Sequence, residues 1–247
     1  MKATIFAIDL FSTAEQYVLH ETQSATTAVC VTSVLKLYEV TMNKIKLLAL
    51  DLDGTTLTSK NTLAPAVKSA LEKAIENGII IAIATGRPLG TMPQSILDIE
   101  GIDYLITSNG AAIYDRHGKK IYSATLKEND VLKILDVMKD EDIISEAFVD
   151  GLTYTDKRYS DNPLAYGCTE AYIDYVKASH GHIEDMRKFI FEHKNELDSI
   201  EYISTDPQTR KRIWTMLENA VDNIFITTSS EHFIELMDKS ATKASAL

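Results

Sequence analysis

Residues 47–57 read LLALDLDGTTL and decide the fold. The almost wholly apolar run over 45–52 predicts a strand buried on both faces, and it leads directly into Asp51, Asp53 and Gly54. Residues two apart on a strand point the same way, so the two carboxylates would repel one another unless a cation holds them or one is protonated. Mg²⁺ takes one or two carboxylates together with water and substrate phosphate. The stretch therefore predicts a magnesium site or an acid–base group at the end of a strand.

Strands and helices alternate after this stretch. The pattern predicts a helix over 65–77, a strand over 79–84, a helix over 92–99 and a strand over 104–108. This spacing is that of a βαβαβ unit with a parallel sheet, in which ligands bind beyond the carboxyl ends of the strands. Three polar clusters lie at those ends: Asp51–Thr55, Thr85–Pro88 and Asn109-Gly110.

The sequence pattern changes after Gly110 and predicts a second α/β module with an antiparallel sheet. A hairpin is expected over 111–124, and further strands over 146–150, 152–155, 200–204, 224–228 and 232–237. Helices are expected over 129–139, 184–194 and 208–217.

Composition bounds the class of protein. The chain has 247 residues, with 25 Lys+Arg against 36 Asp+Glu and a net charge of −11. So acidic a chain is a poor candidate for nucleic-acid binding, although a local cation or a metal can still hold a small phosphorylated ligand. No apolar run approaches the roughly 20 residues that span a bilayer, and we expect a cytoplasmic protein without a membrane partner. Its oligomeric state is left open.

Residues 1–41 stand apart because they show no strong periodicity. The clear pattern begins just after Met42-Asn43-Lys44, so we expect Met42 to be the natural start and residues 1–41 to be an upstream extension. The alternative is a genuine extra helix or a strand pair docked on the core.

The chain resembles the haloacid-dehalogenase-like phosphohydrolases, and most of all their Cof-type branch. The first family motif, a strand followed by DxDGT, matches Asp51–Thr55. The second, a strand ending in Thr or Ser, matches residues 79–85, and the sequence TGRP at 85–88 and SNGA at 108–111 are typical of the branch. Lys243 best matches the motif lysine, with Lys239 as a competitor.

The resemblance implies a Mg²⁺-dependent phosphatase with a Rossmann-like core and an inserted α/β cap. Asp51 would be the nucleophile that forms an aspartyl-phosphate, and Asp53 the general acid and base. Both would serve the metal, Asp51 with its carboxylate and Asp53 with its main-chain carbonyl. The substrate would be a small phosphorylated metabolite, most often a sugar phosphate in this branch.

Five further residues receive roles from the resemblance. Thr85 and Gly86 would hold phosphoryl oxygens, and Lys243 would stabilise the transferring group. Arg87 is expected either to bind substrate or to pair with a surface acid, and Asn109 either to bind substrate or only to form a turn.

The resemblance also implies domain boundaries. Residues 42–112 would form the first part of the core, 113–231 the cap and 232–247 a return to the core. The family's fourth motif, a Gly-Asp-x-x-x-Asp loop, has no match after Lys243. We therefore expect a chain truncated at its C-terminus. A phosphomutase or phosphotransferase on the same scaffold, or an inactive fragment, remain the alternatives.

Overall fold

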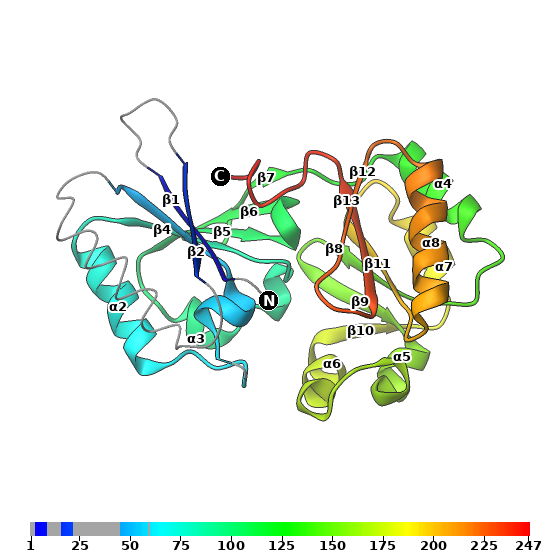
Figure 1. Cartoon of the computed structure of the whole chain (residues 1–247), viewed down its shortest axis with the longest axis horizontal. Coiled ribbons are helices and arrows are strands. Elements are labelled where there is room, and N and C mark those ends of the chain that lie inside the picture. Colours follow the sequence, from blue (N-terminus) through cyan, green and yellow to red (C-terminus); the bar gives the residue numbers. More distant parts are fainter. Residues whose placement is uncertain (1–2, 9–15, 22–44, 59) are drawn as a thin grey trace.

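The computed structural model describes residues 3–8, 16–21, 45–58 and 60–247. It contains two modules, each built on one sheet (Figure 1). The first sheet has the strand order β2-β1-β3-β4-β5-β6-β7 and the second β10-β9-β8-β11-β13-β12.

The strands of the first sheet are β1 (Ala3–Ile8), β2 (Gln16–Glu21), β3 (Leu47–Leu50), β4 (Ile80–Ala84), β5 (Ile102–Thr107), β6 (Ala112–Asp115) and β7 (Lys120–Ser123). Its helices are α2 (Pro65–Glu76) and the short α3 (Gln94–Leu97), and single turns lie at η1 (Leu52–Thr56), η2 (Leu89–Thr91) and η3 (Ser108–Gly110). β3, β4 and β5 are parallel, as predicted, and the other pairings are antiparallel.

Large and small side chains alternate along the central strands, so the two faces of the first sheet pack in different ways. Leu48, Leu50 and Ile81 belong to the cluster that packs beneath α2 and α3. The residues between them, such as Ala49 and Ala82, face the other way and form a separate small-residue cluster. Both sets are buried, which explains why the strands read as continuous apolar runs.

The second module has its helices mainly on one side of its sheet. Its strands are β8 (Ile144–Val149), β9 (Leu152–Asp156), β10 (His180–Ile183), β11 (Leu197–Ile203), β12 (Ile224–Thr227) and β13 (Phe233–Asp238). Its helices are α4 (Glu128–Val137), α5 (Lys157–Asp161), α6 (Ile173–Ser179), α7 (Met186–Glu192) and α8 (Pro207–Ala220), with turns at η4 (Pro163–Tyr166) and η5 (Glu170–Tyr172).

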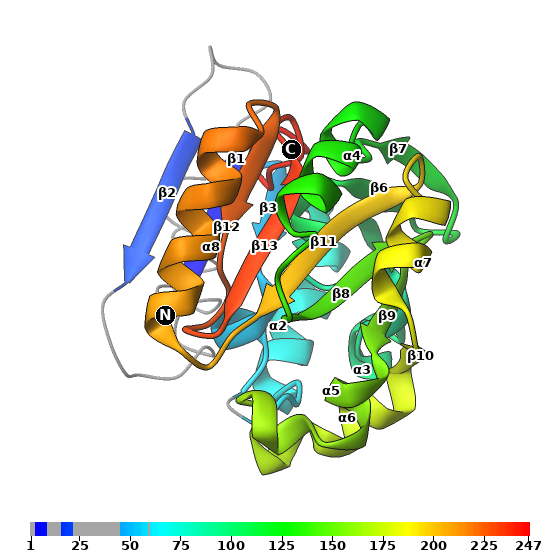
Figure 2. The same ribbon diagram turned by 90° about the vertical axis from the view of Figure 1, so that its right-hand side faces the viewer.

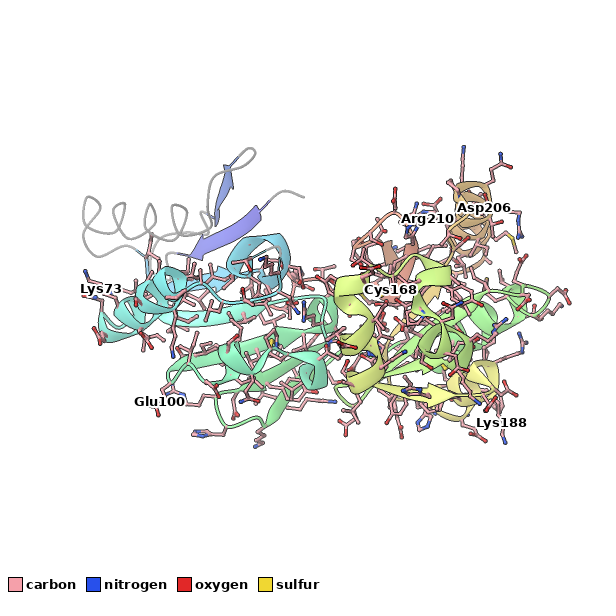
Figure 3. The ribbon with its side chains drawn as sticks, turned by 90° about the horizontal axis from the view of Figure 1, so that it is seen from below. Lys73, Glu100, Cys168, Lys188, Asp206 and Arg210 are labelled. Carbon is pink, nitrogen blue, oxygen red and sulfur yellow. The ribbon has the colours of Figure 1, made fainter. Side chains whose placement is uncertain are left out.

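The helices α4, α7 and α8 lie on the side of the second sheet away from the first module (Figures 1 and 2). α6 lies at the lower end of the second module in Figure 1. In the view from below, Cys168, which precedes α6, lies nearer the first module than Lys188 does (Figure 3). The opposite face of the second sheet is thus turned toward the first module.

The sheets divide the chain differently from the expected boundaries. The hairpin β6–β7, expected in the cap at 113–231, continues the first sheet from β5. β13, expected in the return to the core at 232–247, pairs with β11 and β12 in the second sheet. The sequence pattern of a strand indicates which of its side chains share a face but not which sheet the strand joins, because pairing is a long-range property.

Two further elements differ from expectation. β10 pairs with β9 in parallel, so the second sheet is not wholly antiparallel. In the N-terminal segment, β1 and β2 form an antiparallel pair, and β1 also pairs with β3. This arrangement corresponds to the alternative of a strand pair docked on the core. Met42, the expected start, lies outside the described residues. Within the described ranges, no helix is both long and apolar enough to cross a membrane.

Candidate active site

The three polar clusters meet at one edge of the first sheet. Asp51 follows β3, Thr85 follows β4 and Ser108 follows β5, and these strands are parallel neighbours. Main-chain hydrogen bonds join the loops, because the Asn109 amide donates to the Thr85 carbonyl at 3.0 Å and the Ser108 amide to the Arg87 carbonyl at 3.0 Å. The site residues expected from the sequence therefore come together where a parallel sheet binds its ligands.

Asp51 is paired with a lysine from the far end of the chain. The Nζ of Lys243 donates to Oδ1 of Asp51 at 2.8 Å, and both side chains are mostly buried. Gly110, at φ +106°, makes this approach possible, because a Cβ there would collide with the main chain of Thr242. The competitor Lys239 instead donates to the carbonyl of Asp222 at 3.4 Å.

Asp53 is held by Arg87 through two hydrogen bonds. Nη2 donates to Oδ1 at 2.7 Å and Nε to Oδ2 at 2.9 Å, the two-point geometry that suits a guanidinium and a carboxylate. The Arg87 side chain is 10% exposed and also donates to Oδ1 of Asn61 at 2.7 Å. Burial alone would lower the pKa of Arg87, but the hydrogen bond and charge of Asp53 more than offset this and the pKa is raised.

The structure thus pairs Arg87 with an acid of the site. The sequence left open whether Arg87 binds substrate or pairs with a surface acid. Its partner is Asp53, whose side chain is 39% exposed and remains accessible from solvent. Arg87 is therefore placed to orient Asp53.

Two loops pack closely together near Asp51: one contains Thr85 and Gly86, and the other contains Asn109. Thr85 is fully buried, and its hydroxyl accepts a hydrogen bond from the Arg87 amide at 3.1 Å. A Cβ on Gly86 would lie 3.1 Å from Oδ1 of Asn109, so the loop is tight at this point. Asn109 is more than a turn, because its Nδ2 donates to Oε2 of Glu235 in the second sheet at 3.0 Å.

Two residues of the second module reach this site and carry no local signal in the sequence. The Tyr175 ring, on α6, lies 5.5 Å from the guanidinium carbon of Arg87. Glu235, on β13, meets Asn109 across the two modules. Both lie in ordinary amphipathic stretches, and only the folded arrangement brings them to the strand ends.

The donors at Asp51 and Asp53 suit a hard cation. Lys243 occupies one carboxylate oxygen of Asp51, which leaves the second oxygen and the Asp53 carbonyl as oxygen ligands. Mg²⁺ is bound in this way, by one or two carboxylates and otherwise by water and phosphate. Within the described ranges, no cluster of three or more His, Cys, Asp or Glu side chains is arranged to hold a metal ion. The residues fit a site in which water and substrate supply most of the ligands.

Comparison with known proteins assigns the chain to a family. Residues 48–247 match the family described as haloacid dehalogenase-like hydrolase. The chain is 29% identical over 221 residues to the phosphatase YwpJ of Bacillus subtilis (strain 168), which covers 82% of this chain and 76% of that protein. It is 27% identical over 208 residues to the putative phosphatase YxeH of the same organism, with 82% and 73% covered.

Solved structures show the same architecture. A haloacid dehalogenase-like hydrolase from B. subtilis superposes with a TM-score of 0.67 at 27% identity, covering 82% of this chain and 76% of that one. A subclass IIB sugar phosphatase has the same fold, with a TM-score of 0.62 at 18% identity and with 81% and 72% covered. The chain belongs to the haloacid dehalogenase-like hydrolase family and is a phosphatase of its Cof-type branch.

Proposed function

We propose that the protein is a Mg²⁺-dependent phosphatase that hydrolyses a small phosphorylated metabolite through an aspartyl-phosphate on Asp51. The observation that supports the proposal most strongly is the presence of two ion pairs at the strand ends. Lys243 holds Asp51 at 2.8 Å while Arg87 holds Asp53 at two points, so two neighbouring carboxylates are kept in different surroundings. Sugar phosphates are the first substrate class to test.

The first step would transfer the phosphoryl group to Asp51. A carboxylate oxygen of Asp51 attacks phosphorus, the bond from phosphorus to the ester oxygen breaks, and Asp53 delivers a proton to the departing alkoxide. In the second step Asp53 takes a proton from water as the water attacks phosphorus, which frees Asp51 and phosphate. Asp53 gives up one proton in the first step and regains one from water in the second, so the proton balance of the cycle closes.

Positioning and charge would supply most of the rate enhancement, as phosphoryl transfer requires. Lys243 places a cation beside the attacking oxygen, while Thr85 and the Gly86 amide are placed to hold phosphoryl oxygens. Phosphatases of this superfamily generally use a metal ion. Mg²⁺, held by Asp51 and the Asp53 carbonyl, would offset the repulsion between the anionic nucleophile and phosphate.

The second module would act as the cap. Tyr175 and Glu235 reach from it to Arg87 and Asn109, and the Gly90 amide donates to the Gly151 carbonyl at 2.6 Å between the modules. A cap in this place excludes competing water and contacts the leaving group of the substrate.

The test is phosphate release from p-nitrophenyl phosphate and from a panel of sugar phosphates. We expect activity that requires Mg²⁺ and disappears with excess chelator. Asp51→Asn should fold normally and lose at least about a thousandfold in kcat, or about 4 kcal/mol in the barrier. Asp136→Asn, on the exposed face of α4, is the matched control and should retain full activity. Activity of Asp51→Asn within about tenfold of wild type would refute the proposal.

A further inference from the structure

Asn61 contacts the arginine that holds Asp53. Nη2 of Arg87 donates to Oδ1 of Asn61 at 2.7 Å, in addition to its bond to Oδ1 of Asp53 at 2.7 Å. The two acceptors therefore take the two hydrogens of one guanidinium nitrogen. Asn61 belongs to none of the polar clusters at the strand ends, so its contact with the site comes from the fold.

A short hairpin fixes the position of Asn61. Leu57 and Leu63 form an antiparallel bridge, and Leu57 is buried in the core beneath α2 and α3. The Asn61 amide donates to the Thr58 carbonyl at 2.9 Å, and the Thr58 amide donates to the Thr62 carbonyl at 2.9 Å. The hydroxyls of Thr58 and Thr62 lie 2.7 Å apart. The main chain is thus held on both sides of Asn61.

The backbone of Asn61 is left-handed. Its φ is +58°, in a region that favours glycine and that asparagine adopts more readily than most residues with a side chain. Glycine would therefore satisfy the turn at least as well. What asparagine adds at this position is its side chain, and the oxygen of that side chain accepts the bond from Arg87.

The bond to Asn61 favours one of the two ways in which Arg87 can bind Asp53. A guanidinium can present either Nε and Nη2 or Nη1 and Nη2 to a carboxylate. Here Nε and Nη2 contact Asp53, and Nη1 donates to the Thr91 carbonyl at 3.4 Å. Pairing through Nη1 and Nη2 would need the second hydrogen of Nη2. Asn61 occupies that hydrogen and so opposes the change.

Arg87 would rearrange if the oxygen of Asn61 were removed. Its side chain is 10% exposed, and the Tyr175 ring lies 5.5 Å from its guanidinium carbon. A buried N–H that loses its acceptor costs about 1–3 kcal/mol, which favours any other arrangement that finds one. A turned guanidinium would carry the carboxylate of Asp53 with it, because the two groups are joined at two points.

We propose, on the basis of the proposed phosphatase function, that Asn61 is a positioning residue for the proton transfer by Asp53. Its side-chain oxygen holds Arg87 in the orientation that aims Asp53 at the leaving group, and it takes no proton itself. Asp51 is held separately by Lys243. Loss of the Asn61 oxygen should therefore impair protonation of the leaving alkoxide more than the attack by Asp51.

Two phosphate esters of matched shape test the inference. p-Nitrophenyl phosphate releases a phenolate that departs without a proton, whereas p-nitrobenzyl phosphate, larger by one methylene group, releases an alkoxide that needs one. Asn61→Gly removes the acceptor and keeps the left-handed backbone. Its kcat/KM should fall at least about tenfold for p-nitrobenzyl phosphate and by less than about threefold for p-nitrophenyl phosphate.

Three further variants serve as rescue, control and reference. Asn61→Asp keeps an acceptor oxygen and tolerates the turn, so it should stay within about threefold of wild type with both esters. Lys60→Ala, at an exposed position of the same hairpin, is the matched control and should leave both values unchanged. Asp53→Asn is the reference for a lost proton donor and should show the same selective loss to a greater extent.

A merely structural role for Asn61 would lower kcat/KM for both esters alike, and that result would overturn the inference. Unchanged values in Asn61→Gly would also overturn it, as would an Asn61→Asp variant that loses as much as Asn61→Gly. These outcomes leave the proposed function intact. Asp53→Asn without a selective loss would instead contradict the acid role of Asp53 and the inference with it. Absence of hydrolysis of both esters by the wild-type protein would contradict the phosphatase mechanism itself.

Discussion

The acidic groups at the edge of the first sheet are paired with cations, whereas the buried glutamates on the facing surface of the second sheet have no lysine or arginine partner among the described residues. Asp51 has Lys243 and Asp53 has Arg87, whereas Glu201 lies between two further glutamates. In the first arrangement each carboxylate has a cationic partner within hydrogen-bond distance. In the second, burial raises the pKa of both Glu146 and Glu201 and so favours their neutral forms. The comparison therefore separates acidic groups that have a cationic partner from acidic groups whose neutral form is favoured by burial.

The strongest way to break this comparison is to remove a cation from the first sheet. Lys243→Met should lower kcat by about a hundredfold or more, because the positive charge beside the attacking oxygen is lost. Lys239→Met is the matched control and should have nearly wild-type kcat, since Lys239 contacts the carbonyl of Asp222. Steady-state kinetics with p-nitrophenyl phosphate measure both. Similar kcat values for the two variants would show that Lys243 does not act on the phosphoryl group.

A smaller effect is expected where the two regions touch. Tyr175→Ala removes the ring that lies over Arg87. A cation–π contact is worth about 0.5–2 kcal/mol, so KM should rise about three- to tenfold while the fold persists. Tyr122→Ala, at a partly exposed position on β7, is the control. An unchanged KM would mean that α6 does not help to close the site.

The smallest expected effect is on the pH dependence of stability. It concerns the second sheet alone, because Glu146 lies on β8. Burial raises the pKa of Glu146 to about 7 from an ordinary value of 4.5. Between those values the folded state holds a proton that the unfolded state has lost, so this contribution to stability is present below about pH 4.5 and disappears as the pH rises through 7. The glutamine of Glu146→Gln does not titrate, so this variant does not lose stability from this position as the pH rises.

The thermal midpoint of Glu146→Gln should therefore gain a few degrees on that of wild type between pH 5 and pH 8, corresponding to about 1–3 kcal/mol. The groups around Glu146, which are Glu201, His180 and Thr155, are the same in both proteins and largely cancel. A difference that stays constant over this range would show that Glu146 does not titrate there.

The parallel strands and their polar ends could be read from the sequence because both are local patterns. Asp51 and Thr85 follow apolar strands in a βαβ unit, and the geometry of a parallel sheet then brings them together. Lys243 lies far away in sequence, and only the resemblance to a family indicated it. Its place is set by the close contact of Gly110 with the segment 242–243.

The second module was harder to predict because its pairings are long-range. The sequence gives no sign that β13 lies beside β11, and without that pairing Glu201 and Glu235 are two unrelated surface acids. The same holds for Tyr175, which reaches Arg87 only through the placement of α6. The residues at the strand ends were thus indicated by local motifs, whereas the contacts between strands and modules were not.

The most direct test of the central claim is to trap the phosphoryl group on Asp51. Asp53→Asn should still be phosphorylated by p-nitrophenyl phosphate, because this leaving group needs no proton, while hydrolysis slows for want of a base to activate water. Acid quenching and peptide mass spectrometry should then find one added phosphoryl group on the peptide that contains Asp51. The doubly substituted protein with Asp51→Asn and Asp53→Asn should carry none. Steady turnover of Asp53→Asn with no phosphorylated Asp51, or phosphate on another residue, would contradict the account.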